Sequence, residues 1–207
     1  MDEKTKQMAR YFADKSADSV IGYDKFPMKL GDEQTMVARL LGWYVNVVKS
    51  RGVKFVLDEP TEQKIEKVVK WMLESPKRGL LLCGTLGNGK TSMLRALKYL
   101  FGSSAVYMEA QSAYDYFKQN QSLPSVSPKD ILLIDDLGVE PPSYNDFGNI
   151  RYPLTEFLMS RYRTNSTTVI ATNCNFDQIG EIYGDRIQDR MREMFAMITY
   201  IEPSYRK

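Results

Sequence analysis

The sequence predicts an α/β protein, a three-layer sandwich with a five-stranded parallel sheet that follows a small helical N-terminal segment. Five short apolar runs have the composition of strands buried on both faces, and segments of helical periodicity lie between them. Strands that alternate with helices form parallel sheets with right-handed crossovers. We therefore expect a helical N-terminal segment at residues 1–55, a candidate partner-binding region, and an α/β core at residues 56–207.

Three helices are expected before the first strand, the shortest of them around Thr5–Lys15. Apolar residues between Met36 and Val48 recur with a period of 3.6 residues, and Gly52 ends the helix that they predict. A further helix follows Pro60, whose fixed φ suits the first helical turn. Neither of the two longer helices can bury its apolar stripe by itself, so each needs a packing partner.

The chain after Pro76 predicts the sheet and its crossover helices. Continuous apolar runs predict strands at Gly79–Cys83, Ala105–Met108, Ile131–Ile134, Val169–Thr172 and Phe195–Ile201. Helical segments separate them at Thr91–Phe101, Ala110–Gln119 and Pro153–Arg163, and a short helix begins within Tyr183–Arg190. The stretch Asn120–Lys129, rich in Ser, Pro and Gln, predicts an exposed loop.

The composition excludes several classes of protein. The chain has 207 residues and no histidine, which rules out Ser-His-Asp and Cys-His catalysis. Cys83 and Cys174 match no zinc spacing, so we expect buried free thiols in a reducing cytoplasm. A net charge of +2 argues against a strongly basic nucleic-acid wrapper. The longest uncharged run is too short to span a membrane, and the charged N-terminus is unlike a secretory signal.

A phosphate-binding loop is the strongest motif. The run Gly84-Thr85-Leu86-Gly87-Asn88-Gly89-Lys90-Thr91 reads G-x-x-x-x-G-K-T, follows a predicted strand and opens a predicted helix. Its glycines let backbone amides approach phosphate oxygens, and the helix N-terminus attracts the same anion. Lys90 would meet the outer phosphates and Thr91 would offer its hydroxyl to Mg²⁺. The alternative is a glycine-rich turn with an exposed lysine. The candidate nucleotide-binding residues are Gly84, Thr85, Gly87, Asn88, Gly89, Lys90, Thr91 and Ser92.

Two carboxylates follow the third predicted strand. Because side chains alternate along a strand, Asp135 and Asp136 should point in different directions. We assign Asp135 to the metal and Asp136 to the attacking water, as base or positioning group. The alternative is a pair of turn or helix-cap aspartates. Glu109, at the end of the preceding strand, is the rival base, and its plain alternative is a solvated strand-end carboxylate.

Polar residues near the C-terminal part complete the set of candidates. Asn173 follows the fourth predicted strand, at the edge of a parallel sheet where ligands bind, and could orient the water; its alternative is a turn former. Arg186 and Arg190 share one helix face. One of them could reach the γ-phosphate of a neighbouring subunit, whereas the alternative is ion pairing on a solvated helix.

The motifs together resemble the AAA+ ATPases, which are P-loop NTPases, and specifically the bacterial helicase-loader family of DnaC/DnaI-like proteins. The resemblance covers residues 55–202 and depends on the phosphate loop, Ile-Asp-Asp-Leu-Gly, Ala-Thr-Asn and Gly-Asp-Arg in this order. It implies an ATPase that uses ATP and Mg²⁺, assembles as a homo-oligomer on ATP binding, and loads a ring-shaped replicative DNA helicase onto single-stranded DNA.

The resemblance also implies residue roles. Gly84–Thr91 would be the Walker A loop, Asp135 and Asp136 the Walker B acids, Asn173 the sensor-1 residue and Arg186 the arginine finger. The sequence departs from the family pattern because Asp136 stands where AAA+ proteins usually have Glu, which suggests slow hydrolysis. The chain after Arg186 leaves no room for a C-terminal lid domain, which is also reduced or missing in loaders.

Other functions remain open at this stage. A transposition helper ATPase of the IstB type would have the same fold, and an ATP-dependent scaffold with little hydrolysis is compatible with Asp136. A small-molecule kinase fits less well, because the acid pair and Asn173 suit water as the acceptor. Family members contact single-stranded DNA between the second and third strands, where bases could stack on aromatic residues. The candidates are Tyr114, Tyr116 and Phe117 for stacking and Lys118 for phosphate, and core packing of at least Tyr114 and Phe117 is the alternative.

Overall fold

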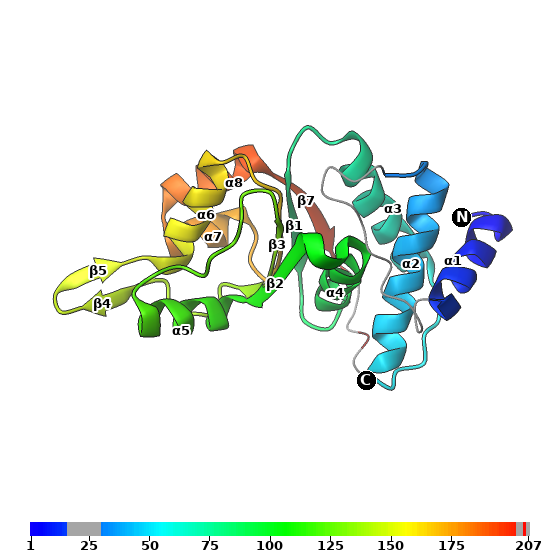
Figure 1. The fold of residues 1–207 in the computed structure, drawn as a ribbon, viewed down its shortest axis with the longest axis horizontal. Helices are drawn as coiled ribbons and strands as arrows, with labels where there is room; N and C mark the ends of the chain where they lie inside the picture. Colours follow the sequence, from blue (N-terminus) through cyan, green and yellow to red (C-terminus); the bar gives the residue numbers. More distant parts are fainter. Residues whose placement is uncertain (16–29, 202–204, 206–207) are drawn as a thin grey trace.

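A computed structural model describes residues 1–15, 30–201 and 205, and it has the predicted α/β architecture. The central sheet has five parallel strands in the order β2-β3-β6-β1-β7. Figure 1 shows this sheet between two helical layers. All five predicted strands are confirmed, as β1 (Gly79–Gly84), β2 (Ala105–Glu109), β3 (Ile131–Leu137), β6 (Thr168–Thr172) and β7 (Phe195–Tyr200).

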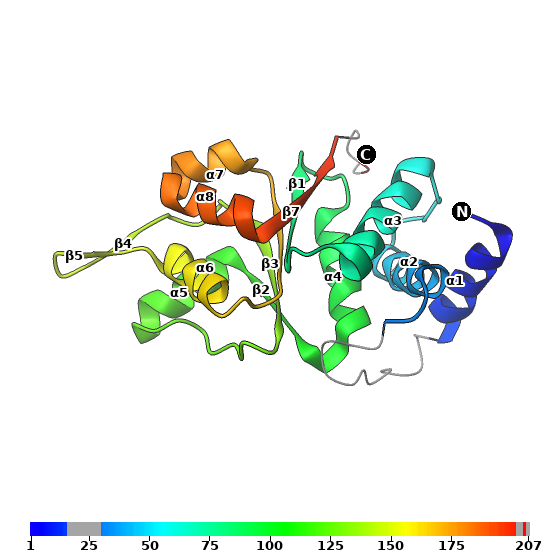
Figure 2. The ribbon, with the colours of Figure 1, turned by 90° about the horizontal axis from the view of Figure 1, so that it is seen from above.

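The helices form one layer on each face of the sheet (Figures 1 and 2). The first layer consists of α2 (Glu33–Ser50), α3 (Glu59–Glu74) and α4 (Lys90–Phe101), with α1 (Glu3–Lys15) packed outside on α2. The opposite layer consists of α5 (Ala110–Asn120), α6 (Pro153–Arg163), α7 (Phe176–Tyr183) and α8 (Asp185–Met194). A single 3₁₀ turn at Gly102–Ser104 joins α4 to β2.

Alternation along the strands supplies both layers with apolar side chains. In β1, Leu80 and Leu82 belong to the core under α2, α3 and α4, whereas Leu81 and Cys83 belong to the core under α5–α8. These strands are therefore apolar on both faces, which is why they appear as unbroken apolar runs in the sequence. None of the helices in the described part of the chain has both the length and the apolar character needed to cross a membrane.

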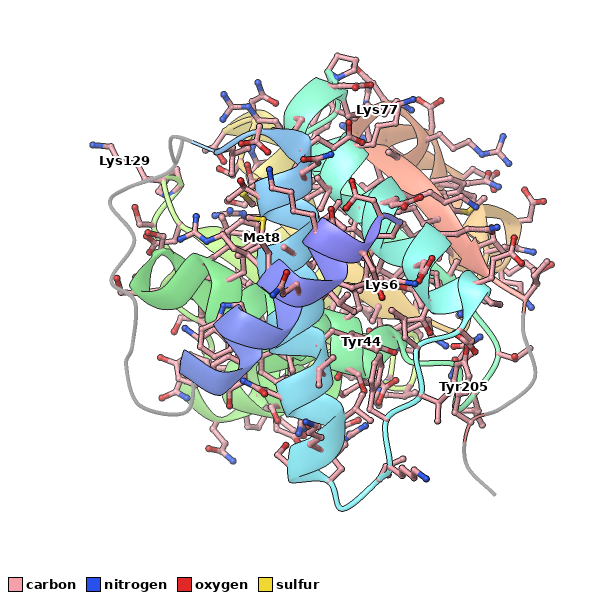
Figure 3. All side chains as sticks on the ribbon, turned by 90° about the vertical axis from the view of Figure 1, so that its right-hand side faces the viewer. Lys6, Met8, Tyr44, Lys77, Lys129 and Tyr205 are labelled. Atoms are coloured by element: carbon pink, nitrogen blue, oxygen red, sulfur yellow. The ribbon has the colours of Figure 1, made fainter. Side chains whose placement is uncertain are left out.

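The N-terminal helices share the core with the sheet. Asp32 caps α2 by accepting a hydrogen bond from the amide of Thr35, and Asp58 caps α3 in the same way. The apolar stripe of α2 is buried against the first layer, and Trp43 stacks on Tyr99 of α4 at 5.2 Å between ring centroids. Figure 3 shows α1 crossing the outer side of α2. The described part of the N-terminal segment thus packs against the α/β core mainly through α2.

A short helix and a β-hairpin were not predicted from the sequence. Helix α7 has only eight residues, and a capping box between Asn175 and Gln178 begins it. The hairpin of β4 (Tyr144–Asp146) and β5 (Asn149–Arg151) projects from the molecule (Figure 1). Its strands are short and largely exposed, so they give no apolar run in the sequence. The residues of its turn are of types that also occur in ordinary loops. The expectation of two buried thiols is corrected for Cys174, which is half-buried, while Cys83 is buried and both are free.

Candidate nucleotide site

The phosphate loop joins β1 to α4, and its glycines are needed for close packing. A Cβ atom at Gly84 would lie 2.1 Å from the carbonyl oxygen of Tyr200 in β7. Gly89, with φ of +97°, precedes α4, and a Cβ atom there would lie 2.5 Å from the hydroxyl of Tyr44. The loop is therefore pressed against β7 on one side and α2 on the other. From the sequence, these glycines were assigned to backbone turns and to phosphate approach, and this close packing was not predicted.

Lys90 is buried within the loop, at 6% exposure. Its ammonium group donates to the carbonyl oxygens of Gly84 at 2.7 Å and Thr85 at 2.6 Å, and to Oδ1 of Asn88 at 3.2 Å. Asn88 is also buried, and its Nδ2 donates to the Tyr200 carbonyl at 2.8 Å. This is unlike the exposed lysine that a plain glycine-rich turn would have. Carbonyl oxygens of the loop thus hold the ammonium group of Lys90 at the N-terminus of α4.

The candidate metal ligands meet at the start of α4. Thr91 Oγ1 donates to Oδ1 of Asp135 at 3.1 Å, and the hydroxyl of Tyr107 donates to Oδ2 at 2.7 Å. Asp135 is only 2% exposed. Burial and the hydrogen bond with Asp135 raise the pKa of Tyr107, so this phenol stays protonated and remains a donor. A hydroxyl and a carboxylate are the hard oxygen donors that Mg²⁺ prefers, so the residues present fit this ion.

The side chains of Asp135 and Asp136 point in different directions, as predicted, and a β-bulge contributes to this in addition to the alternation of side chains along the strand. The pairing of β3 with β6 shifts register between Ile134 and Leu137, and Asp136 adopts φ of +54°. This bulge leaves Asp135 buried and turns Asp136 to the surface, where it lines the same cavity as Lys90. A positive φ is uncommon outside glycine and is best tolerated by Asp and Asn.

Asn173 lies on the wall of this cavity, just beyond β6. The strand end is fixed by Thr172, whose hydroxyl donates to the carbonyl of Leu137 at 2.6 Å and accepts from the amide of Cys174 at 3.0 Å. Asn173 itself lies in a bend, in line with the turn-forming alternative, and Asn175, two residues later, caps α7. Asn173 is exposed and faces the cavity that Asp136 also lines.

The cavity, of about 530 Å³, is lined by the phosphate loop, Asp136 and Asn173. Three aromatic residues, here called its aromatic end, also line it: Tyr44 of α2, Phe55 of the α2–α3 linker and Tyr205 of the C-terminal segment. Tyr44 and Tyr205 are labelled in Figure 3. The rings of Tyr44 and Phe55 meet edge to face at 6.2 Å, and the amide of Tyr205 donates to the Gly87 carbonyl at 2.9 Å. An anion-binding end beside an aromatic end matches the chemistry of a nucleotide. The sequence analysis missed this aromatic end.

The remaining candidates lie elsewhere. Glu109 ends β2, is exposed and is not among the residues that line the cavity. Arg186 is exposed on α8 and borders a different hollow with Tyr152 and Glu156. Arg190 pairs with Glu193 at 2.9 Å and donates to the Tyr162 hydroxyl at 3.2 Å, which confirms the ion-pair alternative for this arginine.

The proposed DNA-contacting cluster on α5 is divided by the fold. Tyr114 and Phe117 are buried in the core at 8% and 0% exposure, so the core-packing alternative holds for these two. Tyr116 and Lys118 are exposed on the other side of α5, and the Lys118 ammonium lies 6.0 Å from the ring centre of Tyr144 in the hairpin. The prediction of base stacking is thus corrected for Tyr114 and Phe117.

A buried carboxylate behind the acid pair was also missed. Glu140 is 3% exposed, accepts a hydrogen bond from the amide of Gly138 at 3.1 Å, and accepts another from the hydroxyl of Tyr183. Burial raises the pKa of the Glu140 carboxyl. Glu140 thereby connects the loop after Asp136 to Tyr183 at the end of α7. A single residue, Gly184, separates Tyr183 from α8, the helix that carries Arg186.

Comparison with known proteins shows a likeness of fold to solved structures. No protein-family model and no curated protein matches the sequence. A solved structure of DnaI superposes with a TM-score of 0.51 at 20% identity, covering 74% of this chain and 88% of that one. A structure described as a DNA replication initiation factor gives 0.50 at 17% identity, covering 71% and 48%. The chain has the fold of the AAA+ domains of replication proteins. At these identities the likeness concerns the fold.

Proposed function

We propose that this protein is a helicase-loader-like ATPase of DNA replication that binds and hydrolyses ATP with Mg²⁺. The observation that supports this most strongly is that Lys90, Thr91, Asp136 and Asn173 line one cavity together with aromatic residues. Asp135 lies behind Thr91 and is hydrogen-bonded to it. Separate roles as turn or helix-cap residues would not explain why these side chains lie close to one another.

In the proposed reaction, the loop amides and Lys90 bind the phosphates, while Thr91 and Asp135 hold Mg²⁺. The ion supplies charge neutralisation for the phosphate oxygens. Asn173 orients a water, and Asp136 accepts its proton as the water oxygen bonds to the γ-phosphorus. The bond from that phosphorus to the bridging oxygen breaks, leaving ADP and phosphate. The shorter side chain of Asp136, compared with Glu, predicts slow turnover.

The proposed partners are a replicative helicase, single-stranded DNA and further copies of the same chain. The fold shared with DnaI supports this choice, and the position of Arg186 outside the cavity is compatible with a role at a neighbouring subunit's site. A transposition helper of the IstB type would use the same cavity and a different partner.

The proposed function is tested by two measurements on the full chain. Calorimetric titration with ATP should detect binding that requires Mg²⁺, and phosphate release should rise when oligo-dT or higher protein concentration is supplied. Co-purification with the replicative helicase of its host would support the loader assignment. Binding of ATP without measurable phosphate release under any of these conditions would indicate a nucleotide-dependent scaffold, and absence of ATP binding would contradict the proposal as a whole.

A further inference from the structure

Arg51 places a positive charge on the wall of the cavity that the phosphate loop also lines. It follows the last turn of α2 and lines the cavity, and its Nη1 donates to Oγ of Ser92 at 3.3 Å. Ser92 is the third residue of α4 and is buried at 5% exposure. The guanidinium group therefore lies beside the first turn of the helix whose N-terminus closes the phosphate loop.

The Arg51 residue lies between two helix ends. Its backbone is the C-cap of α2, where a cation is favoured, whereas its guanidinium group lies beside the N-terminal end of α4. A helix N-terminus carries a partial positive charge, so a cation beside it is repelled. Lys90 adds a second positive charge at the same helix end, and Ser92 is a neutral acceptor. Among the described residues, Arg51 forms no ion pair with a carboxylate that would offset this repulsion. Binding of a polyphosphate between Arg51, Lys90 and the loop amides would relieve it.

The geometry of Arg51 also suits such a ligand. A guanidinium group has five N–H donors in a planar fork, and the contact with Ser92 occupies only one nitrogen. Arg51 is exposed at the cavity wall, so the remaining donors can meet phosphate oxygens from the solvent side. Bidentate contacts of this kind are among the strongest that a side chain makes with phosphate.

The order of groups along the cavity indicates which phosphates Arg51 meets. Successive residues of a helix project about 100° apart. In the first turn of α4, Thr91 projects toward Asp135 and the metal side, whereas Ser92 meets Arg51, which comes from the same helix as Tyr44 of the aromatic end. Arg51 thus meets a different side of α4 from Thr91 and Asp135, which favours contact with the phosphates that are common to ATP and ADP.

We propose that Arg51 is a phosphate-binding residue of the nucleotide site, supplied by the N-terminal segment and contacting the phosphates that ATP and ADP share. This inference rests on the proposed nucleotide-binding function. The end of α2 is then part of the site, while the apolar stripe of this helix is part of the core. A nucleotide would then join α2 to α4 through its phosphates, in addition to the apolar contacts between these two helices.

The test compares Arg51→Ala, Arg51→Lys and the control Lys49→Ala on the full chain. Lys49 is an exposed cation in the last turn of α2 that does not line the cavity, so its removal changes the net charge equally. We expect Arg51→Ala to weaken Mg-ATP and Mg-ADP binding by similar factors of about ten or more, since a hydrogen bond to a charged group is of this strength. Arg51→Lys should recover part of the loss, and Lys49→Ala should stay within about twofold of wild type.

The outcomes separate this inference from the function it rests on. The nucleotide-induced rise in Tm should shrink in Arg51→Ala while the Tm without nucleotide stays near wild type, because Arg51 is exposed. Unchanged affinity for both nucleotides would overturn the role of Arg51 and leave ATP binding by the protein intact. Weakened ATP binding with unchanged ADP binding would overturn the assignment to the shared phosphates. Failure of the wild type to bind either nucleotide would overturn the proposed function and this inference together.

Discussion

The hydroxyl of Thr91 lies 3.1 Å from Oδ1 of Asp135, and this contact joins the first turn of α4 to the end of β3 across 44 positions of sequence. The other carboxylate oxygen accepts from Tyr107 of β2. Asp135 is thus oriented from two neighbouring elements before any cation binds. Preorganised ligands of this kind favour a metal site, because little ordering is left for the binding step.

The first prediction is that Lys90→Ala lowers Mg-ATP affinity by at least a hundredfold. The ammonium group is the buried cation of the loop, and its loss removes a charge-assisted contact in a desolvated setting. Calorimetry measures the effect. The matched control is Lys98→Ala, which removes a lysine that likewise donates to two carbonyls, those of Gly102 and Ala105, at the other end of α4. Loss of binding in both variants would point to a general weakening of α4.

The second prediction separates the two acids. Asp136→Asn should bind ATP normally and hydrolyse it at least about tenfold more slowly, as expected when a positioned base is removed. Asp135→Asn should mainly raise the Mg²⁺ concentration needed for half-maximal binding. Phosphate release and Mg²⁺ titrations measure these effects. Wild-type turnover in Asp136→Asn would transfer the role of base elsewhere, and Glu109→Gln is then the variant to measure.

The third prediction concerns the pH dependence of stability. Burial raises the pKa of Glu140 in the folded state, so folding favours its protonated form. Its contribution to stability is fully present below the unfolded pKa and is lost as pH rises through the folded pKa. Glu140→Gln keeps the shape and lacks this loss, because an amide can still accept from Gly138 and donate to Tyr183.

The free energy of unfolding of Glu140→Gln, relative to wild type, should therefore increase as the pH rises above about 4.3, the ordinary pKa of Glu. Urea denaturation at several pH values gives this difference. As a control, Glu156→Gln should behave oppositely, because a hydrogen bond from Arg151 lowers the pKa of Glu156. A difference for Glu140→Gln that stays constant with pH would show that this carboxyl has an ordinary pKa in the folded protein.

The fourth prediction is that Lys118→Glu weakens salt-sensitive binding of oligo-dT and that Tyr116→Ala weakens it further. Both side chains are exposed on α5, where a base could stack on the ring and a phosphate could meet the ammonium. Fluorescence anisotropy at several salt concentrations measures the change. Lys129→Glu, which reverses a charge in the loop after α5, is the control. Absence of oligo-dT binding by the wild type at low salt would contradict a DNA role for α5.

The predictable features of this chain are those whose signal is local in sequence. The strand at β1 is an apolar run because both of its faces are buried, and the phosphate loop and the acid pair each occupy contiguous residues. The aromatic end of the cavity has no such signal. Tyr44 and Phe55 look like ordinary members of an amphipathic helix and a linker, and Tyr205 is separated from them by most of the chain. Only tertiary packing brings the three rings together.

Asp135 and Asp136 point in different directions, as predicted, but alternation along the strand is only part of the reason. Simple alternation would send the two side chains to opposite faces of a regular strand, and both faces of this sheet are covered by helices. The register shift after Ile134 and the positive φ of Asp136 place that carboxylate at the surface of the cavity. A bulge of this kind depends on the neighbouring strand, so it leaves no mark in the sequence of β3 itself.

The fifth prediction is that Arg186 acts on the nucleotide of a neighbouring subunit. In its own chain it borders a hollow with Glu156 and Ile187, apart from the cavity that holds Lys90. An arginine supplied in trans accounts for a factor of a thousand or more in some phosphoryl-transfer enzymes. Arg186→Ala should therefore bind ATP normally and hydrolyse it poorly, and wild-type specific activity should rise with protein concentration.

Mixing variants gives the sharpest form of this test. Equal amounts of Arg186→Ala and Lys90→Ala should recover part of the activity, because one kind of mixed interface carries an intact phosphate loop from the first variant and an intact Arg186 from the second. Arg190→Ala is the matched control, since this arginine is on the same helix and is paired with Glu193 and Tyr162. Its turnover should stay near wild type. Specific activity that is independent of concentration, with no recovery on mixing, would leave Arg186 as a surface residue of α8 without a role in hydrolysis.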